Sequence, residues 1–358
     1  MKASRIIIVV VIVVIIAIAA IYALGVFTAA PSPCTTTWQC GVGYPVQVGG
    51  TYAIAGEQCL SGSGTIYCIG GQDANGGPRS EAYYASVSAS GNITGWTLAS
   101  NAYPKTINGE SCVTSSGTVY CVGGSYNDAG DDVNSSYYAS VTASGIPGSW
   151  TSTTGFPIPI DTQSCTASSS YIYCVGGNNE TDGSNADSTP TNSVWYAPLS
   201  ASGIGKWVLT TAFPSNVYFP SCYASGNDIY CVGGVDDNGN SLGDAYYATI
   251  SSSGVGAWTS TTQYPVAGTG QACVFASGDL LCVGGQTSGN PSYTSAVYYA
   301  PISSGGIGAW KQATSYPDGV GTTCTTLSGD IYCVGGFDGS STMETYFVEY
   351  ASIATLMS

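Results

Sequence analysis

The chain has 358 residues, of which only 8% are charged, against roughly 25% in an ordinary globular domain. Its 6 Lys and Arg residues against 21 Asp and Glu give a formal net charge of −15, which leaves no basic surface able to neutralise nucleic-acid phosphates. Histidine is absent, which excludes His-dependent triads, His-ligated zinc or copper and imidazole acid–base chemistry.

Residues 1–27 predict an N-terminal transmembrane helix that acts as a signal-anchor. Lys2 and Arg5 precede an uncharged apolar segment, 6–27, of 22 residues. As a helix this segment is about 33 Å long, enough to cross a hydrocarbon core of about 30 Å. Cleavage at residues 28–30, or pilin-type processing before the apolar segment, remains an alternative. The positive-inside rule predicts a single-pass cell-membrane protein whose remaining residues are extracellular.

Twelve of the fourteen cysteines form six pairs that share the spacing Cys-x8-Cys and recur every 51 to 57 residues, a period typical of propellers and solenoids. In each pair a two-residue turn, such as Ser116-Gly117, places the two cysteines opposite each other on a hairpin. Cross-strand Cα atoms lie about 4.5–5.5 Å apart, within disulfide range, so we predict structural disulfides rather than metal ligation. The predicted bonds join Cys59 with Cys68, Cys112 with Cys121, Cys165 with Cys174, Cys222 with Cys231, Cys273 with Cys282 and Cys324 with Cys333.

Cys34 and Cys40 stand outside this pattern. In an extended strand their Cα atoms would lie about 20 Å apart, so a bond between them requires the chain to fold back. A disulfide within the chain and one between two chains both remain open for this pair.

Each cysteine hairpin belongs to a longer repeat. The hairpin ends in a double glycine. After it come, in order, a polar loop, an aromatic pair, a Trp, and an aromatic residue followed by Pro (the aromatic–Pro step). The glycines are Gly70-Gly71, Gly123-Gly124, Gly176-Gly177, Gly233-Gly234, Gly284-Gly285 and Gly335-Gly336. The aromatic pairs are Tyr83-Tyr84, Tyr137-Tyr138, Trp195-Tyr196, Tyr246-Tyr247 and Tyr298-Tyr299, and the tryptophans are Trp96, Trp150, Trp207, Trp258 and Trp310.

This order of residues resembles the kelch repeat, and the resemblance covers 38–353 in six copies. It implies an all-β, six-bladed kelch-like β-propeller with four strands in each blade. The disulfide in every blade and the scarcity of arginine depart from the family pattern and indicate a secreted variant. The last repeat lacks a Trp strand, whereas Trp38 begins an orphan copy of one, so we expect the Trp38 strand to complete the last blade and remove both sheet edges. Residues 28–37 then form a short linker and 354–358 a tail.

Candidate binding residues cluster on one predicted face of the ring. The position two before each hairpin's first cysteine should line the channel mouth, and it is a glutamate in two adjacent blades. Carboxylates also fill two loops after double glycines, which lack the spacing of a calcium loop, so we expect no bound metal or cofactor. The candidates are Glu57, Glu110, Asp128, Asp131, Asp132, Asp236 and Asp237, together with Tyr126, Tyr218, Phe219 and Tyr293 as aromatics able to stack on sugars. Glycosylation acceptor patterns begin at Asn92, Asn134 and Asn179.

These features predict a membrane-anchored, extracellular binding or adhesion module and not an enzyme. We expect the module to recognise a glycan or a cell-surface protein through the loops of its distal face, the face that points away from the membrane. One alternative is a structural subunit of a cell-surface layer or filament that self-associates. The other is a carboxylate-dependent, glycoside-active enzyme that uses Glu57 and Glu110. Nucleic acid is not an expected partner.

Overall fold

The computed structural model describes residues 34–48, 51–126, 131–142, 145, 147–168, 170–179, 189–288, 292–337 and 345–358. The chain divides into two compact units, Met1–Cys34 and Thr35–Ser358. The predicted transmembrane segment, 6–27, and the first part of the predicted linker lie outside the described residues. Within the described part of the chain, no helix is both long and apolar enough to span a membrane.

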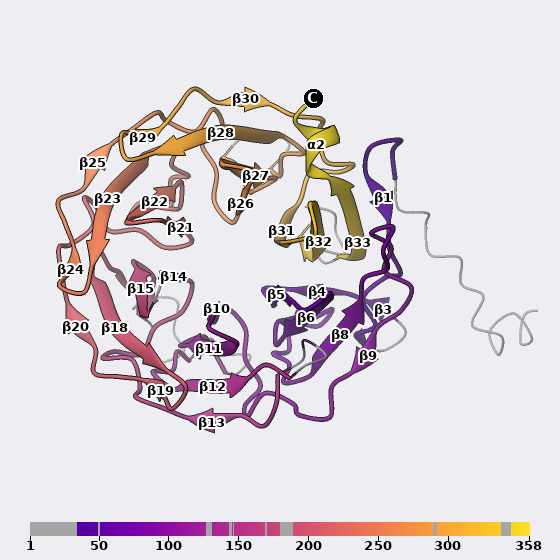
Figure 1. Ribbon diagram of the computed structural model, residues 1–358, viewed down its shortest axis with the longest axis horizontal. Coiled ribbons are helices and arrows are strands. Elements are labelled where there is room, and N and C mark those ends of the chain that lie inside the picture. The colour runs from indigo at the N-terminus through magenta and orange to yellow at the C-terminus, as the bar shows by residue number, and fades with distance from the viewer. Residues whose placement is uncertain are drawn as a thin grey trace, which may run out of the picture. The chain divides into compact units, whose positions relative to one another are not determined.

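The described residues of 35–358 form an all-β, six-bladed propeller, whose blades we number in the order of their cysteine pairs (Figure 1). In every blade the first strand lies innermost, the first three strands pair antiparallel in chain order, and the outermost strand pairs with the third. Blade 1 contains β5 (Gln58–Gly62), β6 (Thr65–Ile69), β8 (Ala82–Ser86) and β9 (Thr97–Leu98). Blade 2 contains β10 (Ser111–Ser115), β11 (Thr118–Val122), β12 (Ser136–Ser140) and β13 (Thr151–Ser152).

Blades 3, 4 and 5 carry a fifth, two-residue strand that pairs with the end of the third. Blade 3 contains β14 (Ser164–Ser168), β15 (Tyr171–Val175), β18 (Val194–Ser200), β19 (Gly203–Ile204) and β20 (Val208–Leu209). Blade 4 contains β21 (Ser221–Ser225), β22 (Asp228–Val232), β23 (Ala245–Ser251), β24 (Gly254–Val255) and β25 (Thr259–Ser260). Blade 5 contains β26 (Ala272–Ala276), β27 (Asp279–Val283), β28 (Val297–Ser303), β29 (Gly306–Ile307) and β30 (Lys311–Gln312).

Blade 6 is completed by the N-terminal part of the propeller. It contains β31 (Gly321–Leu327), β32 (Asp330–Phe337) and β33 (Thr345–Ser352), and β1 (Gln39–Cys40) pairs antiparallel with β33 in the register Gln39 to Tyr350. This is the closure that the orphan Trp38 copy predicts. Two short strands extend the sheet of blade 6, because β4 (Ile54–Ala55) pairs with β33 and with β7 (Gln72–Asp73). Outside the blades, β2 (Gln47–Val48) pairs with β3 (Thr51–Tyr52), and β16 (Asn178–Asn179) pairs with β17 (Thr189–Pro190).

The cysteine hairpins adopt the predicted register, and all six predicted disulfides are present. In each blade the two cysteines are cross-strand partners with a Cα–Cα distance of 4.0–4.1 Å, slightly shorter than the 4.5–5.5 Å expected of an ordinary cross-strand pair. The bonds join Cys59 with Cys68, Cys112 with Cys121, Cys165 with Cys174, Cys222 with Cys231, Cys273 with Cys282 and Cys324 with Cys333.

The second cysteine of each pair is the more deeply buried one. Cys68, Cys121, Cys174, Cys231, Cys282 and Cys333 are at most 1% exposed, because each lies on the second strand of its blade, between two paired neighbours. The turn between the two cysteines has a positive φ at both central residues in blade 2, 48° at Ser116 and 74° at Gly117. We predicted positive φ only for Gly and Asn, yet the serine also adopts it. Cys34 and Cys40 are disulfide-bonded too, and no described cysteine is free.

An aromatic girdle joins neighbouring blades around the whole ring. It consists of six edge-to-face contacts between the aromatic residue of an aromatic–Pro step and the repeat tryptophan, with ring centroids 4.8–5.0 Å apart. The pairs are Tyr44–Trp96, Tyr103–Trp150, Phe156–Trp207, Phe213–Trp258, Tyr264–Trp310 and Tyr316–Trp38. Because the last pair joins blade 5 to the N-terminal Trp38, the girdle closes where the sheet closes.

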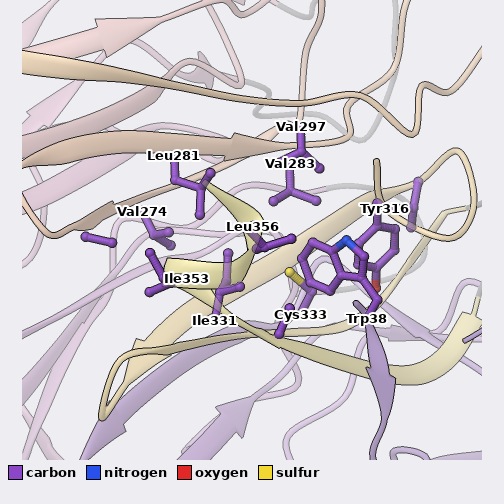
Figure 2. Close-up of a cluster of buried hydrophobic side chains, with 13 residues drawn as sticks. Trp38, Val274, Leu281, Val283, Val297, Tyr316, Ile331, Cys333, Ile353 and Leu356 are labelled. Carbon is purple, nitrogen blue, oxygen red and sulfur yellow. The ribbon is translucent and has the colours of Figure 1, made fainter. Parts of the chain in front are cut away.

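The C-terminal residues seal the closure. Helix α2 (Ile353–Leu356) buries Ile353 and Leu356 in the cluster that contains Trp38 and Tyr316 (Figure 2). The residues after 353, which we expected to form only a tail, therefore include buried side chains. Apolar contacts of this kind stabilise a fold by about 25 cal/mol for each Å² removed from water.

Candidate functional site

The residues just before the first strand of each blade form the mouth of the central channel. We define the channel mouth as the residue three positions before the first cysteine in each blade: Gly56, Gly109, Thr162, Phe219, Gly270 and Gly321. The first five of these have φ between 53° and 68°, a left-handed conformation that favours glycine. Backbone hydrogen bonds run from one member to the next, with the N–H of Phe219 donating to the carbonyl of Thr162 (2.9 Å) and that of Thr162 to the carbonyl of Gly109 (2.9 Å). Hydrogen-bonded backbone thus lines the mouth along blades 1 to 4, and of the six mouth residues only Thr162 and Phe219 carry side chains.

A cavity of 760 Å³ extends from this mouth along the first strands of all six blades. Its volume lies within the range of roughly 300–1,000 Å³ that small-molecule sites occupy. Hydroxyl and amide side chains such as Thr114, Thr166 and Gln286 line it, together with aromatic residues including Phe219. Among the described residues its lining contains no Lys, Arg or Asp, and its two glutamates are buried. The surface offered to a ligand is thus uncharged and rich in hydrogen-bonding groups.

The residue two positions before the first cysteine reaches across to the preceding blade. Nε2 of Gln163 donates a hydrogen bond to the carbonyl of Val122 (2.7 Å), and Nε2 of Gln271 donates to the carbonyl of Val232 (2.9 Å). Each of these carbonyls belongs to the residue directly before a double glycine. The glutamines therefore fasten one blade to the next instead of facing a ligand.

Glu57 and Glu110 occupy the same position in blades 1 and 2 and are only 1% and 2% exposed. Oε1 of Glu110 lies 2.7 Å from the point where Gly70 would carry a Cβ atom, much as Nε2 of Gln163 lies 2.8 Å from the corresponding point at Gly123. Neither carboxyl oxygen of Glu110 meets a hydrogen-bond partner within the described part of the chain. The two glutamates, predicted to line the mouth, are thus buried beneath its surface.

Burial raises the pKa of the Glu110 carboxyl to about 8; the backbone N–H of Glu110 itself opposes this shift, and the nearby charge of Glu57 adds to it. The buried phenol of Tyr44 interacts with both glutamates and that of Tyr103 with Glu110, and burial raises the pKa of each phenol. A protonated carboxyl can donate as well as accept a hydrogen bond, like the amide of glutamine. Glu110 therefore matches the glutamine joints best when it is neutral.

Hydrogen bonds engage the carboxylates of the acidic loop that contains Asp236 and Asp237. Oδ1 of Asp236 accepts hydrogen bonds from the backbone N–H groups of Asn238 (2.8 Å) and Asn240 (2.9 Å), and these contacts with Asn240 and Asn238 lower the pKa of Asp236. Oδ2 of Asp237 accepts a hydrogen bond from Nδ2 of Asn216 (3.2 Å). No group of three potential metal ligands comes together among the residues that the structure describes. The geometry of this loop is that of a self-capped turn.

The second acidic loop is described only in part. Asp132 is buried and accepts a hydrogen bond from Oγ of Ser125 (2.9 Å), while Oδ2 of Asp131 accepts one from the hydroxyl of Tyr126 (3.3 Å). Asp128 lies outside the described residues. Asp132 thus holds its loop against the blade, and Tyr126, 40% exposed, stands at the surface with Nζ of Lys105 5.8 Å from its ring centre.

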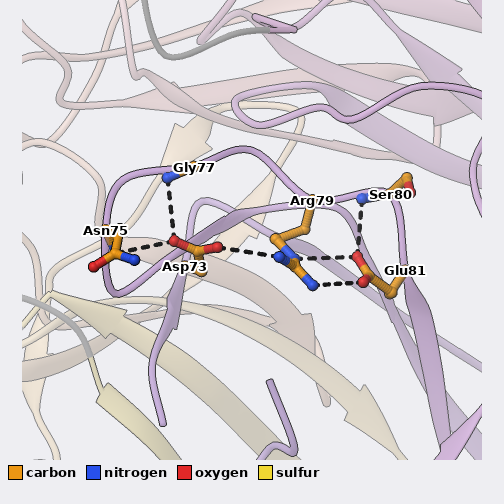
Figure 3. Close-up of polar contacts among 6 residues, drawn as sticks. All are labelled: Asp73, Asn75, Gly77, Arg79, Ser80 and Glu81. Atoms are coloured by element: carbon orange, nitrogen blue, oxygen red, sulfur yellow. Dashed lines mark hydrogen bonds and ion pairs between the residues drawn. The ribbon is translucent and has the colours of Figure 1, made fainter. Parts of the chain in front are cut away.

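The single arginine of the propeller also stabilises a loop. Arg79 forms ion pairs with Asp73 (3.2 Å) and Glu81 in the loop that follows Gly70-Gly71 (Figure 3). Oδ1 of Asp73 accepts further hydrogen bonds from the backbone of Asn75 (2.9 Å) and Gly77 (3.2 Å). Arg79 is therefore committed to its own loop and is not aimed into the channel.

Two of the three predicted glycosylation acceptors are exposed. Asn92 and Asn134 lie at the surface, and Oδ1 of Asn92 accepts a hydrogen bond from the hydroxyl of Tyr350. Asn179 is partly buried, and its Nδ2 donates to the carbonyl of Pro159 (2.7 Å). Asn179 is thus the least accessible of the three acceptors.

The unusual backbone of Phe219 was not predicted from the sequence. A signal for it is present, because aligning the repeats on their first cysteine puts glycine at four of six mouth positions and Phe at one. Its ring is 43% exposed and lies beside that of Tyr218, with centroids 5.6 Å apart. Tyr293 also lines the cavity, where its ring approaches Gly321. The structure thus brings Phe219 and Tyr293 to the cavity and leaves Tyr126 on an outer loop.

Neither a family model nor a curated protein matches this chain. Its fold is similar to that of a solved structure, "Structure of YjhT", with a TM-score of 0.67 and 13% sequence identity. The similarity covers 86% of this chain and 95% of that one. At this identity the likeness shows the propeller fold alone, and the seven disulfides indicate an extracellular or secreted module.

Proposed function

We propose that this protein is a membrane-anchored, extracellular binding module that recognises neutral glycans at the mouth of its channel. The observation that carries the proposal is the cavity of 760 Å³ on the ring axis, to which all six blades contribute uncharged hydrogen-bonding and aromatic groups. Neutral sugars combine hydroxyl groups with apolar C–H faces, so they match both kinds of lining. The anchor is the apolar segment 6–27, and the kelch-like repeats supply the rigid scaffold.

The cavity favours binding over catalysis. Glycoside hydrolysis needs two carboxyl groups that reach the scissile bond, and those of Glu57 and Glu110 are buried in the joints between blades. The acidic residues of the outer loops are engaged within those loops, as at Asp236. The groups that remain available at the mouth are suited to holding a ligand rather than transforming it.

The proposal is tested by incubating the purified full-length chain, in a detergent without a sugar headgroup, with an array of neutral and anionic glycans. We expect retention of neutral glycans, and the same retention by the paired variant Asp236→Asn and Asp237→Asn. A folded chain that retains no glycan would contradict the proposal. Binding that disappears in the paired variant would instead place recognition on the acidic loop.

A further inference from the structure

Phe219 occupies a position in the channel mouth where the backbone favours glycine. Its φ is 53°, while the equivalent glycines in blades 1, 2 and 5 have φ values of 68°, 64° and 63°. Residues with a Cβ atom adopt this region rarely, because Cβ approaches the following carbonyl oxygen. The hydrogen bond from the N–H of Phe219 to the carbonyl of Thr162 holds the backbone in this conformation.

Packing does not explain why a bulky residue stands there. The side chain of Phe219 is 43% exposed, whereas the phenylalanines of the aromatic girdle, Phe156 and Phe213, are 2% and 4% exposed. Its one described ring contact is with Tyr218, at 5.6 Å and a tilt of 48°. Strained residues that the core does not require are found at functional sites, so the conformation of Phe219 points to a ligand.

The surroundings of the ring define the chemistry of that ligand. Phe219 lines the cavity together with Thr162 of the preceding blade and Gln286 of the following blade. Thr162 is partly exposed, and its hydroxyl, which donates to Oδ1 of Asp161 (3.1 Å), can still accept a hydrogen bond, while the exposed Gln286 offers an amide to the same cavity. A ligand that fits has an apolar face for stacking and neutral hydroxyl groups around its rim.

We infer that Phe219 is a stacking platform for the C–H face of a neutral pyranose ring, with Thr162 and Gln286 as flanking hydrogen-bonding residues. This inference rests on the proposed function and names the part of the channel mouth that carries it. The asymmetry of the mouth follows directly, since the glycines of four other blades leave room for the rest of a longer glycan. Stacking on the aromatic ring requires a sugar with an apolar C–H face. The flanking polar groups discriminate between sugars by the arrangement of their hydroxyl groups.

The test uses the full-length chain and four defined probes: the methyl β-pyranosides of glucose, galactose and mannose, and methyl β-glucuronide as the charged comparison. Saturation-transfer NMR reports which ligand protons contact the protein, and a titration gives the dissociation constant. We expect at least one neutral pyranoside to bind through its axial C–H protons. Phe219→Gly should weaken that binding about tenfold or more, whereas Phe219→Trp should retain it.

Glycine is the natural residue at four equivalent positions, so Phe219→Gly is expected to fold as well as the wild type, and its melting temperature is measured alongside. Tyr126→Ala removes an exposed aromatic from an outer loop and should leave binding unchanged. Unchanged affinity in a folded Phe219→Gly variant would overturn the inference, and so would binding of the glucuronide alone. If neutral glycans are retained on the array but Phe219→Gly leaves the dissociation constant unchanged, only the inference about Phe219 fails. If no neutral glycan binds in either experiment, the proposed function fails with it.

Discussion

The aromatic girdle and the channel mouth are built from the same repeat, yet they differ in how closely the six copies agree. All six girdle contacts are edge-to-face pairs with centroids 4.8–5.0 Å apart. At the mouth, four positions are glycine, one is Thr162 and one is Phe219. The contacts that close the ring are thus nearly identical in all six blades, whereas the residue at the mouth differs between blades.

The same contrast separates the joints beneath the mouth. Gln163 and Gln271 each donate to a carbonyl of the preceding blade, whereas Glu110 holds the equivalent position without a partner for its oxygens among the described residues. A single exchange of amide for carboxyl converts a pH-independent joint into one whose stability depends on protonation. Variation between the repeats therefore affects stability.

Removing the closing member of the girdle should have the largest effect. Trp38 is completely buried and joins the N-terminal strand to blades 5 and 6. Trp38→Ala is expected to lower the free energy of unfolding by about 3–5 kcal/mol, because it leaves a large cavity where the ring closes. Denaturant unfolding measures the loss. A change under about 1 kcal/mol would show that the closure does not hold the ring together.

Acidic conditions should stabilise the Glu110 joint. The folded-state pKa of about 8 lies above the ordinary value of 4.5, so the folded protein binds more protons than the unfolded chain between these values. The contribution of Glu110 is therefore fully present below about pH 4.5 and is lost as the pH rises through about 8. Each pKa unit corresponds to about 1.4 kcal/mol, which makes the total a few kcal/mol.

The variant Glu110→Gln restores the joint found in blades 3 and 5. It should match the wild type in stability at pH 4 and exceed it at pH 8.5, as measured by thermal unfolding across this range. The converse change, Gln163→Glu, should introduce the same pH dependence into blade 3. A stability difference between Glu110→Gln and the wild type that stays constant with pH would contradict this account.

Two glycines of blade 5 separate conformational strain from steric conflict. A Cβ atom at Gly284 would lie 2.1 Å from the carbonyl oxygen of Val320, whereas one at Gly278 would meet no atom within 4 Å. Both have positive φ, at 65° and 94°. Gly278→Ala should cost about 1–2 kcal/mol of stability and Gly284→Ala a further 1–3 kcal/mol. Equal losses in chemical denaturation would show that the blades are not packed as closely as the distance implies.

The smallest effect is expected at the mouth itself. Phe219→Gly relieves a left-handed backbone at a cost in chain entropy, so stability should rise or fall by no more than about 1 kcal/mol. Calorimetry of the variant measures the change. A destabilisation above about 2 kcal/mol would assign Phe219 to the framework and remove the contrast between mouth and girdle.

The sequence predicted the framework well because its signals are local and repeated six times. Paired cysteines fix the hairpin register, and the double glycine and aromatic residues recur at constant spacing. The orphan Trp38 was sufficient to predict the strand that completes blade 6. The buried packing of Leu356 was not predicted, because it depends on a cluster formed by residues distant in the chain.

The site was predicted less completely, for a physical reason. The sequence predicts that Glu57 and Glu110 line the channel mouth, but their side chains are buried in the joints between blades. Side-chain direction at the start of a strand depends on the neighbouring blade, which a single repeat does not encode. Likewise, the hydrogen bonds that cap Asp236 arise within its loop and leave a turn where the composition suggested a ligand site.

Fluorine NMR tests the central claim of neutral-glycan recognition at the mouth most directly. The full-length chain has 7 phenylalanines, so incorporation of 4-fluorophenylalanine gives few resonances, and the signal of Phe219 is assigned by its loss in Phe219→Gly. On titration with a neutral glycan retained by the array, we predict a saturable shift of the Phe219 resonance and none at the buried Phe156 and Phe213. A Phe219 resonance that stays in place while the glycan is fully bound would contradict the account.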